Sequence, residues 1–307
     1  MSTFVSIPGG GDHNVHVHGD GSVFLGSGND LIGISGNGET VVAGNGNDTV
    51  HIHGNAYWVG LGDGNDKVYV GGNANVNVGI GNDTVNVGGG NVNVGYGNDS
   101  VVMRGDGLIV TGSGNNHLTL LGNGSVWAGA GNDTIHLGSG NDTVWAEGSA
   151  TVHGAFGSAT LVGAMMDVTH SHGVTTDALY GGAATLLGGT GPTKFVGGNG
   201  SSTAVMKGGL GNDTFVGGVG HDTMVGGQGQ NLFEFLSKDA GGQHVITNFV
   251  SGQDQLYVEG HTLAYLQDHH DISTSGGNTF ISLDGGQTTI ELKGVTTLSS
   301  ADFTPHK

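Results

Sequence analysis

The sequence predicts an all-β protein built as a parallel β-roll, a β-solenoid with two short strands per coil, followed by a C-terminal β-rich cap. Two observations predict this fold: a G-x-G-N-D motif recurs through the first half of the chain, and apolar residues alternate with polar ones on both sides of it. A third is the glycine content, 66 of 307 residues, because tight turns favour glycine. A motif that repeats at a fixed interval, combined with apolar residues at every second position, indicates strands stacked in successive coils.

The motif returns at a nearly constant interval. Its last residue recurs in steps of 18, 18, 17, 16, 17 and 17 residues, at Asp30, Asp48, Asp66, Asp83, Asp99, Asn116 and Asp133. One step accommodates a coil of two strands of about five residues and two turns of about four. Stacked coils would therefore place all of these side chains on one edge.

Apolar residues form columns on both sides of the motif. In strand A, the strand after the motif, they lie two and four residues beyond the aspartate, as in Ile32 and Ile34 or Val50 and Ile52. In strand B, the strand before the motif, they include Val23 and Leu25. This is the alternation of half-buried strands, whereas an amphipathic helix would need apolar residues three and four apart. We expect the two strands to face each other across a thin aliphatic core.

The charge of the chain favours cations as partners. There are 26 acidic and 7 basic residues, which give a net charge of −19, so nucleic acid and membrane insertion are not expected. No cysteine is present, which excludes disulfide bonds. Residues 1–11 lack the basic start and apolar core of a cleavable signal peptide.

The motif has the chemistry of a calcium site. Calcium prefers six to eight oxygen ligands, which glycine-rich turns supply from backbone carbonyls while one aspartate per turn adds charge; transition metals would favour histidine or cysteine. The alternative is that Asn-Asp only favours a tight turn, but six of seven successive motifs keep the aspartate. The predicted metal residues are Gly26, Gly28, Asp30, Gly44, Gly46, Asp48, Gly62, Gly64, Asp66, Gly79, Gly81, Asp83, Gly95, Gly97, Asp99, Gly129, Gly131, Asp133, Gly138, Gly140, Asp142, Gly209, Gly211, Asp213, Gly218, Gly220 and Asp222.

Later repeats resemble the calcium-binding nonapeptide G-G-x-G-x-D-x-U-x of the repeats-in-toxin (RTX) family, in which U is a large apolar residue. Residues 208–216 and 217–225 match it, and 226–234 match it except for Asn231 in place of the aspartate. Residues 234–303 resemble the region that closes the roll in secreted members. The resemblance implies a calcium-loaded β-roll, exported from a Gram-negative bacterium by a type I system that reads an uncleaved C-terminal signal.

Four segments are expected along the chain. Residues 1–146 form the calcium-binding roll, with repeats beginning by about Gly9. Residues 147–207 keep a strand rhythm but mostly lack the motif, with a loop near residues 164–177; residues 208–233 carry the nonapeptides, and 234–307 form the cap and secretion region. At Asp133 and Asp142, and at Asp213 and Asp222, the step falls to nine, so both edges of the roll are expected to carry ions there.

Histidine pairs suggest zinc as a second metal. His16/His18, His51/His53 and His170/His172 are each spaced two apart, which could place two imidazoles on one face of a strand. Aligning the coils does not put these pairs on neighbouring coils, so solvent-exposed outward side chains are the preferred interpretation.

The outward residues of strand B favour association. Phe24, Val42, Trp58, Val110 and Trp127 would lie exposed on one sheet, unless the C-terminal segment folds back over them, and exposed patches of this kind mark interaction sites. Aromatic side chains could also stack on sugar rings. The residues before the first coil are too few to cover it, so association could be end-on or lateral.

No H-E-x-x-H or G-x-S-x-G motif occurs, so we expect no enzyme, although a solenoid enzyme acting on polysaccharide remains an alternative. We expect a secreted, calcium-dependent structural protein that folds and self-assembles on binding calcium, in a biofilm matrix or cell-surface layer. The main alternative is a carbohydrate-binding adhesin module with extracellular polysaccharide as partner. Ice binding would need a more regular row of threonines than the x positions of the motif provide.

Overall fold

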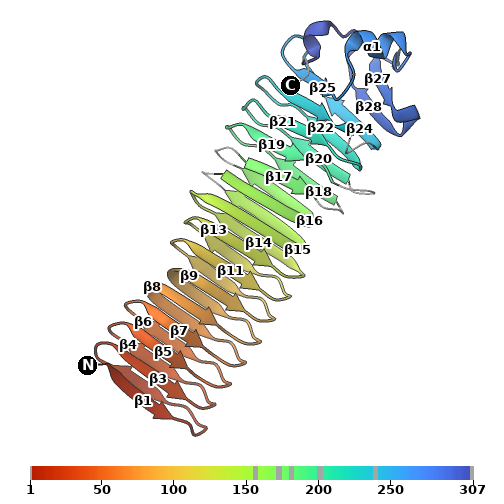
Figure 1. Cartoon of the computed structure of the whole chain (residues 1–307). Helices are drawn as coiled ribbons and strands as arrows, with labels where there is room; N and C mark the ends of the chain where they lie inside the picture. Colours follow the sequence, from red (N-terminus) through yellow and green to blue (C-terminus); the bar gives the residue numbers. More distant parts are fainter. Residues whose placement is uncertain are drawn as a thin grey trace. The chain divides into compact units, whose positions relative to one another are not determined.

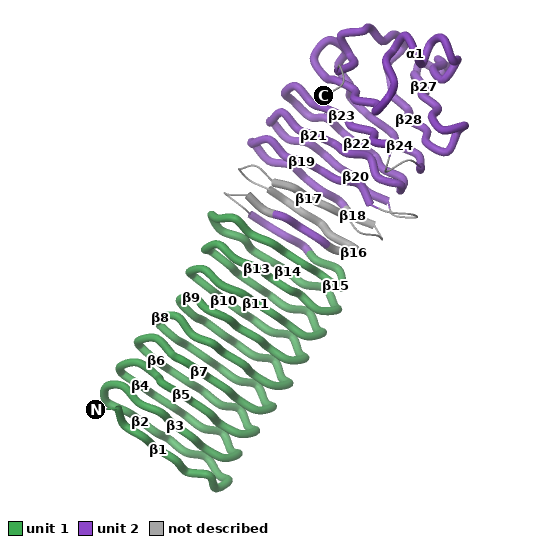
Figure 2. The backbone as a smooth tube through the Cα atoms, viewed as in Figure 1, with its two compact units in different colours: residues 1–150 green, residues 151–307 purple. Residues whose placement is uncertain are grey.

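The computed structural model describes residues 2–154, 158–170, 175–179, 183–198, 203–237 and 241–304, with no side-chain description for residues 158–159, 163–170, 175–179 and 183–184. The chain divides into two compact units, residues 1–150 and 151–307 (Figure 2). Each unit is described by itself.

Unit 1 is a stack of coils in which two parallel ladders alternate along the chain (Figure 1). The strand-A ladder runs through β2 (Asn14–Val17), β4 (Leu31–Ile34), β6 (Thr49–Ile52), the first parts of β8 (Lys67–Asn77) and β9 (Thr84–Val94), β10 (Ser100–Met103), β12 (His117–Leu120) and β14 (Asn132–Leu137). The strand-B ladder runs through β1 (Thr3–Ile7), β3 (Gly21–Leu25), β5 (Gly38–Val42), β7 (Ala56–Gly60), the second parts of β8 and β9, β11 (Gly107–Thr111), β13 (Gly124–Ala128) and β15 (Asn141–Gly154).

The predicted register and core of unit 1 are confirmed. Thr49 pairs with Leu31 and Lys67 with Thr49, each one motif step apart. The inward columns of both ladders are buried, and Val23, Ile32 and Val50 have no exposed surface. The stack begins earlier than expected, because Thr3–Ile7 already forms a strand paired with β3. The sequence before Gly9 lacks the motif, which is why periodicity did not reveal this strand.

Unit 2 also contains two parallel ladders. The first joins β17 (Thr175–Leu179), β19 (Thr193–Val196), β21 (Thr214–Gly217), β23 (Leu232–Phe235) and β25 (Gln255–Val258). The second joins β16 (Ser158–His170), β18 (Ala183–Leu187), β20 (Thr203–Lys207), β22 (His221–Val225), β24 (Gly242–Thr247) and β28 (Thr288–Leu292).

The loop expected near residues 164–177 differs from the structure. β16 continues to His170 and β17 begins at Thr175, while residues 171–174 lie outside the described part. β16 is long enough to pair with β17 over residues 160–163 and with β18 over residues 167–169. One uninterrupted strand thus contributes to both ladders, and the absence of a motif does not interrupt the strands.

The C-terminal residues form the expected β-rich cap. Beyond β25 come the short helix α1 (Leu263–Asp268) and the antiparallel strands β26 (Ile272–Ser275) and β27 (Asn278–Leu283), and β27 pairs with β28. Short 3-10 turns follow, η2 (Asp284–Gly286) and η3 (Ser300–Asp302). Asp302 is fully buried and accepts hydrogen bonds from Ser251, Gly252 and Ser299, which fastens the end of the described chain to the cap.

A row of stacked phenylalanines fills the core of unit 2. The rings of Phe195, Phe215 and Phe233 lie 4.9 Å apart in succession, and Phe249 continues the row at 5.9 Å. Three of these side chains have no exposed surface. Stacked aromatic rings contribute beyond the area they bury, so this row replaces the thinner aliphatic column seen in unit 1.

We expect Phe215→Ala to destabilise unit 2, because it removes a buried ring with a stacked neighbour on each side. Such a truncation costs about 3–5 kcal/mol. Denaturant unfolding in calcium, followed by far-UV circular dichroism, measures the loss. Leu210→Ala is the control, because Leu210 is 56% exposed; equal effects of the two substitutions would contradict the role of the aromatic row.

Candidate metal centre

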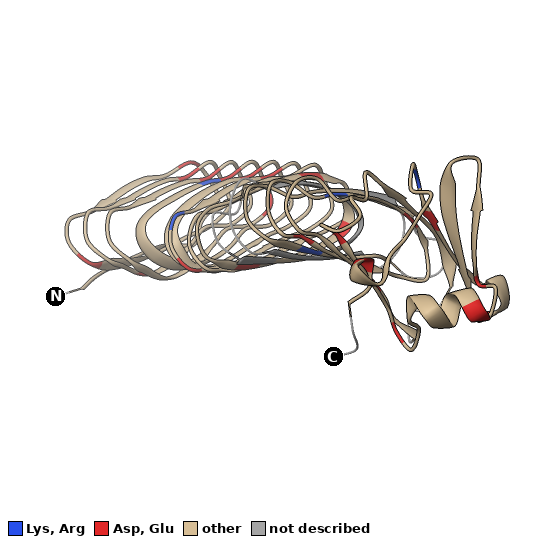
Figure 3. Ribbon diagram, turned by 90° about the horizontal axis from the view of Figure 1, so that it is seen from above, with Lys and Arg blue, Asp and Glu red and all other residues tan. Residues whose placement is uncertain are grey.

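The motif aspartates of unit 1 form a continuous ladder along one edge. The Oδ1 atom of each carboxylate accepts a hydrogen bond from the backbone N–H of the corresponding residue one coil earlier. The N–H groups of Asp30, Asp48 and Asp66 donate in this way to Asp48, Asp66 and Asp83, each at 2.8 Å. The acidic residues recur along the turns of the coils in Figure 3. Each carboxylate therefore joins two coils.

Among the described residues, the second oxygen of each of these carboxylates has no hydrogen-bond partner. The Oδ2 atoms of these aspartates are buried and accept no hydrogen bond, and the residues themselves are at most 4% exposed. An unpaired buried carboxylate oxygen is costly, because it loses hydration without compensation. The group comprises Asp30, Asp48, Asp66, Asp83, Asp99, Asp133 and Asp142.

Burial also disfavours the charged form of Asp48, Asp66 and Asp83 in the metal-free protein. Desolvation raises the pKa of Asp66 to about 7 and those of Asp48 and Asp83 to about 6, opposed by the backbone hydrogen bonds and reinforced by neighbouring carboxylates. Desolvation likewise raises the pKa of Asp99 and Asp133. A column of ionised carboxylates at this edge therefore requires positive charge nearby.

The glycines of the motif bring backbone oxygens close to the same edge. Gly46 has φ of +147°, and a Cβ at this position would lie 1.9 Å from the carbonyl oxygen of Gly28, one coil earlier. Only glycine allows this approach. Unpartnered carboxylate oxygens beside crowded glycine carbonyls are the donor set of a hard divalent cation, so the residues present fit calcium. When bound, calcium would supply the positive charge that these carboxylates lack.

The asparagine before each aspartate builds a second ladder, which sequence reasoning did not assign. Its Oδ1 accepts the backbone N–H of the asparagine one coil later, as from Asn47 to Asn29 at 2.8 Å and from Asn65 to Asn47 at 2.7 Å. The constant Asn in the motif was the available signal. This ladder satisfies exposed turn amides and holds the coils in register.

Asp142 lies on the opposite edge of the coil. It pairs in register with Gly124, and its Oδ1 accepts the N–H of Gly124 at 3.1 Å, while Oδ2 has no partner. Desolvation raises its pKa to about 6. This placement agrees with the nine-residue step from Asp133, and occupation of both edges stays a prediction.

The aspartates of unit 2 differ from one another. Both oxygens of Asp213 accept hydrogen bonds, from the backbone N–H groups of Thr193 and Gly209. Asp222 keeps an unpartnered Oδ1, and its Oδ2 lies 3.0 Å from the Nδ1 atom of His244, which occupies the next position of the ladder. Sequence reasoning missed Asp254, which accepts the N–H groups of Asn231 and Val250 and has no nonapeptide around it.

The histidine pairs do not assemble a further metal site in the described part of the chain. There, no three His, Asp or Glu side chains form a metal-binding cluster. His51 stacks on Tyr69 with ring centroids 4.7 Å apart, and the Nδ1 atom of His53 lies 3.3 Å from the carbonyl oxygen of Ile34. His172 lies outside the described residues.

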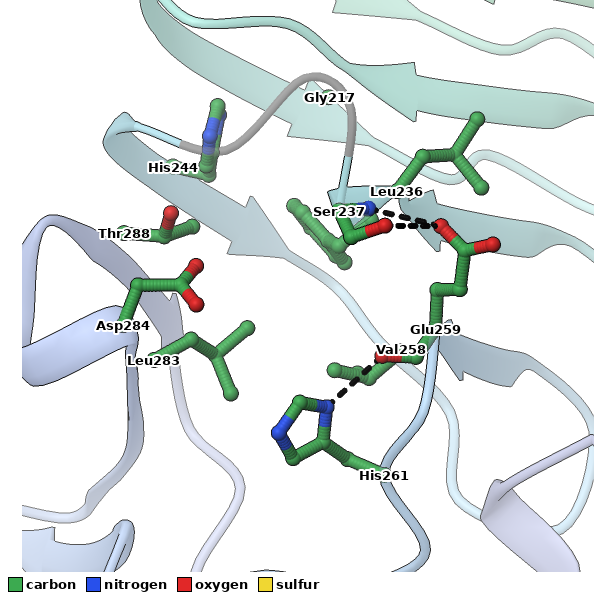
Figure 4. Close-up of a pocket in the computed structure, with 11 residues that line it drawn as sticks. Gly217, Leu236, Ser237, His244, Val258, Glu259, His261, Leu283, Asp284 and Thr288 are labelled. Atoms are coloured by element: carbon green, nitrogen blue, oxygen red, sulfur yellow. Dashed lines mark hydrogen bonds between the residues drawn. The ribbon is translucent and has the colours of Figure 1, made fainter.

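A small pocket in unit 2 gathers a serine and two histidines (Figure 4). Its volume is about 30 Å³, room for a water molecule or two. The hydroxyl and the backbone N–H of Ser237 both donate to Glu259 at 2.8 Å, and the Nδ1 atom of His261 lies 2.8 Å from the Glu259 carbonyl oxygen. These contacts hold the Ser237 side chain against Glu259, beside a pocket that has room only for water.

The metal-free protein is expected to gain β structure as the pH falls from 7.5 to 5. Aspartates in an unfolded chain have a pKa of about 4, whereas those of Asp48, Asp66 and Asp83 are raised to about 6 to 7 in the fold. The folded state binds more protons between these values, so its stability is greatest below them and falls as the pH rises through them. Circular dichroism after removal of divalent ions measures this. An ellipticity independent of pH would contradict the raised pKa values.

Comparison with protein families finds one match. The model described as RTX calcium-binding nonapeptide repeat (4 copies) matches residues 104–144 and 197–233. Comparison with curated proteins finds no match. Within the described residues, no helix has the length and apolarity needed to cross a membrane. The matched segments contain Asp133, Asp142, Asp213 and Asp222, and the same ladder geometry extends over the earlier coils. The chain therefore carries RTX calcium-binding nonapeptide repeats within a parallel β-roll.

Proposed function

We propose that this protein is a secreted structural protein that folds on binding calcium and then self-associates in a biofilm matrix or cell-surface layer of a Gram-negative bacterium. One observation carries the proposal: the ladder of buried carboxylates in unit 1, each with an oxygen that has no partner in the part of the chain that the structure describes. Secretion is supported by the RTX repeats, and export by a type I system is part of the proposal.

The energetics of the ladder support folding coupled to calcium. Neighbouring strands in a sheet are about 5 Å apart, so successive carboxylates repel one another in a poorly hydrated edge. The aliphatic core of each coil is thin and opposes this repulsion weakly. A ligand that binds only the folded state adds its binding free energy to folding. Calcium is therefore proposed as an obligatory part of the folded roll.

The strand-B face of unit 1 supports association with a second copy of the chain. We use this name for the outward residues two and four positions before each turn; they include Ser22, Phe24, Thr40, Val42, Trp58, Gly60, Asn75, Asn77, Asn91, Asn93, Leu108, Val110, Ser125, Trp127, Thr143 and Trp145. None of these residues is charged, although the chain carries −19. Acidic side chains border the face at Glu39, which accepts a hydrogen bond from Ser22, and at Glu147, which lines a hollow with Trp127 and Trp145. Two copies would therefore meet on the uncharged positions between them.

Aromatic side chains give this face its apolar character. Trp58, Trp127 and Trp145 are 40%, 55% and 50% exposed, and the rings of Trp127 and Trp145 lie 6.2 Å apart. Of the five predicted interface residues, Trp58 and Trp127 are exposed, while Phe24, Val42 and Val110 are half-buried. Sequence reasoning missed Trp145, because the motif before it lies on the opposite edge. Exposed tryptophans are frequent anchors of protein interfaces.

A second candidate function is binding of a neutral polysaccharide. A hollow of about 440 Å³ on this face is lined by Tyr57, Trp58 and two rows of asparagines. The side-chain amide of Asn91 donates to Asn75 at 2.9 Å, and that of Asn93 donates to Asn77 at 2.7 Å. These hydrogen bonds hold the asparagine amides in place beside the aromatic rings. Aromatic stacking combined with amide hydrogen bonds and no charge suits sugar rings.

We propose no catalytic role. The absence of H-E-x-x-H and G-x-S-x-G motifs from the sequence supports this interpretation. A solenoid enzyme remains an alternative only if scattered carboxylates act together, and the motif carboxylates are buried at the turns.

Calcium is expected to convert a largely disordered chain into the β-roll. Circular dichroism in chelator should show little β signal, which rises on addition of calcium and hardly at all with magnesium, because magnesium demands a tighter octahedral geometry and gives up water reluctantly. A back-titration with chelator is the control for reversibility. A fully folded protein in chelator would refute calcium-coupled folding.

Self-association is expected to depend on the tryptophans. Sedimentation in millimolar calcium should show large assemblies that dissolve in chelator, and Trp58→Asp with Trp127→Asp should reduce them. Tyr265→Asp is the matched control, since it adds charge at a 40% exposed aromatic on α1.

A wild-type monomer at high concentration in calcium would contradict self-assembly. A glycan array in calcium then decides the second candidate: binding that Trp58→Asp abolishes would favour the polysaccharide. Absence of both association and glycan binding would leave neither role for the strand-B face.

A further inference from the structure

One coil of unit 1 satisfies its ligand position without a cation. Asn116 stands where the other coils have aspartate, and its Oδ1 accepts the N–H of Asp99 at 3.0 Å, as a motif carboxylate would. Its Nδ2 carries two hydrogens, which face three oxygens: Asp133 Oδ1 at 2.9 Å, and Thr111 Oγ1 at 3.2 Å together with the more distant carbonyl oxygen of Gly112 at 3.4 Å. The amide nitrogen therefore replaces the carboxylate oxygen that has no partner elsewhere.

Thr111 is a second departure from the pattern in the same coil. It occupies an inward column of strand B and is 5% exposed. The equivalent residues in the other coils are aliphatic, namely Leu25, Ala43, Leu61, Val78, Val94 and Ala128. A buried hydroxyl needs a partner, and here its oxygen accepts from the Asn116 amide at 3.2 Å and from the backbone N–H of Gly129 at 3.4 Å. The two substitutions thus complement each other within one site.

The amide of Asn116 also changes the charge at this position. In the aspartate coils, two negative oxygens and nearby carbonyls attract a cation. In the Asn116 coil, one of these oxygens is an NH₂ group that presents positive hydrogen atoms toward the same kinds of acceptor. A cation there would be repelled by the amide hydrogens and would find the carbonyl oxygen of Gly112 already engaged.

We propose that the side-chain amide of Asn116, assisted by Thr111, is a built-in substitute for a calcium ion. The coil that contains Asn116 therefore binds no metal. This coil divides the carboxylate ladder of unit 1 into a continuous row from Asp30 to Asp99 and a separate position at Asp133. This inference rests on the proposed occupation of the aspartate coils by calcium.

Unit 2 contains an independent example of the same exchange. Asn231 replaces the aspartate of the third nonapeptide, and its Nδ2 donates to Asp254 Oδ1 at 3.1 Å and to the carbonyl oxygen of Gln228 at 3.3 Å. Its backbone N–H donates to Asp254 Oδ1 at 2.9 Å, as in the ladder of unit 1. The amide again bonds to the next carboxylate and to a carbonyl of its own turn.

Asn116→Asp tests the inference. The substitution restores a carboxylate with an unpartnered oxygen, so equilibrium dialysis should show one more calcium ion per chain than wild type, and the variant should be less folded in chelator. Asn115→Asp is the matched control: it adds the same charge at the adjacent exposed position and should leave the number of bound ions unchanged. Asn231→Asp should add one ion independently of Asn116→Asp.

The outcomes separate this inference from the proposed function. Wild type that binds no calcium would refute the proposed function itself. Wild type that binds calcium, with no additional ion in Asn116→Asp, would overturn the inference alone. Failure of Asn116→Asp to fold in saturating calcium would also overturn it, because calcium is required to satisfy the new carboxylate. An extra ion in both Asn116→Asp and Asn115→Asp would show a general charge effect and would equally overturn it.

Discussion

The structure of unit 1 depends on one repeated hydrogen bond, from a backbone N–H at the motif position to the carboxylate Oδ1 one coil later. This bond fixes the register between coils and satisfies a buried amide. It also commits each carboxylate to a place where its second oxygen is buried without a partner. In the aspartate coils, the same contact that aligns neighbouring coils therefore leaves a buried carboxylate oxygen that a cation would satisfy.

The ladders and their inward columns could be predicted from sequence, because two regular periods determine them. The step of 16 to 18 residues fixes which residues stack, and alternation fixes which side faces inward, as Val23 and Ile32 illustrate. The first part of strand β16 was expected from its strand rhythm, but its continuation beyond residue 163 was not, because a loop was expected near residues 164–177. Periodicity detects turns better than it detects strands.

The details of the candidate site were less accessible from sequence. That Asp66 has one bonded and one unpartnered oxygen depends on the direction of its side chain, which no pattern encodes. The bond between Asn116 and Thr111 joins two substitutions that look unrelated in the sequence. Asp254 sits outside any nonapeptide and enters the ladder only because β23 and β25 are in register. These features depend on packing between coils.

The central claim is that calcium is required to hold the carboxylate ladder. Amide hydrogen exchange at Asp30, Asp48 and Asp66 tests it most directly, because these N–H groups donate to the carboxylates in question. Calcium should protect these amides strongly, and its removal at neutral pH should abolish the protection while calcium restores it. Equal protection with and without calcium would show that the ladder is stable alone and would contradict the account.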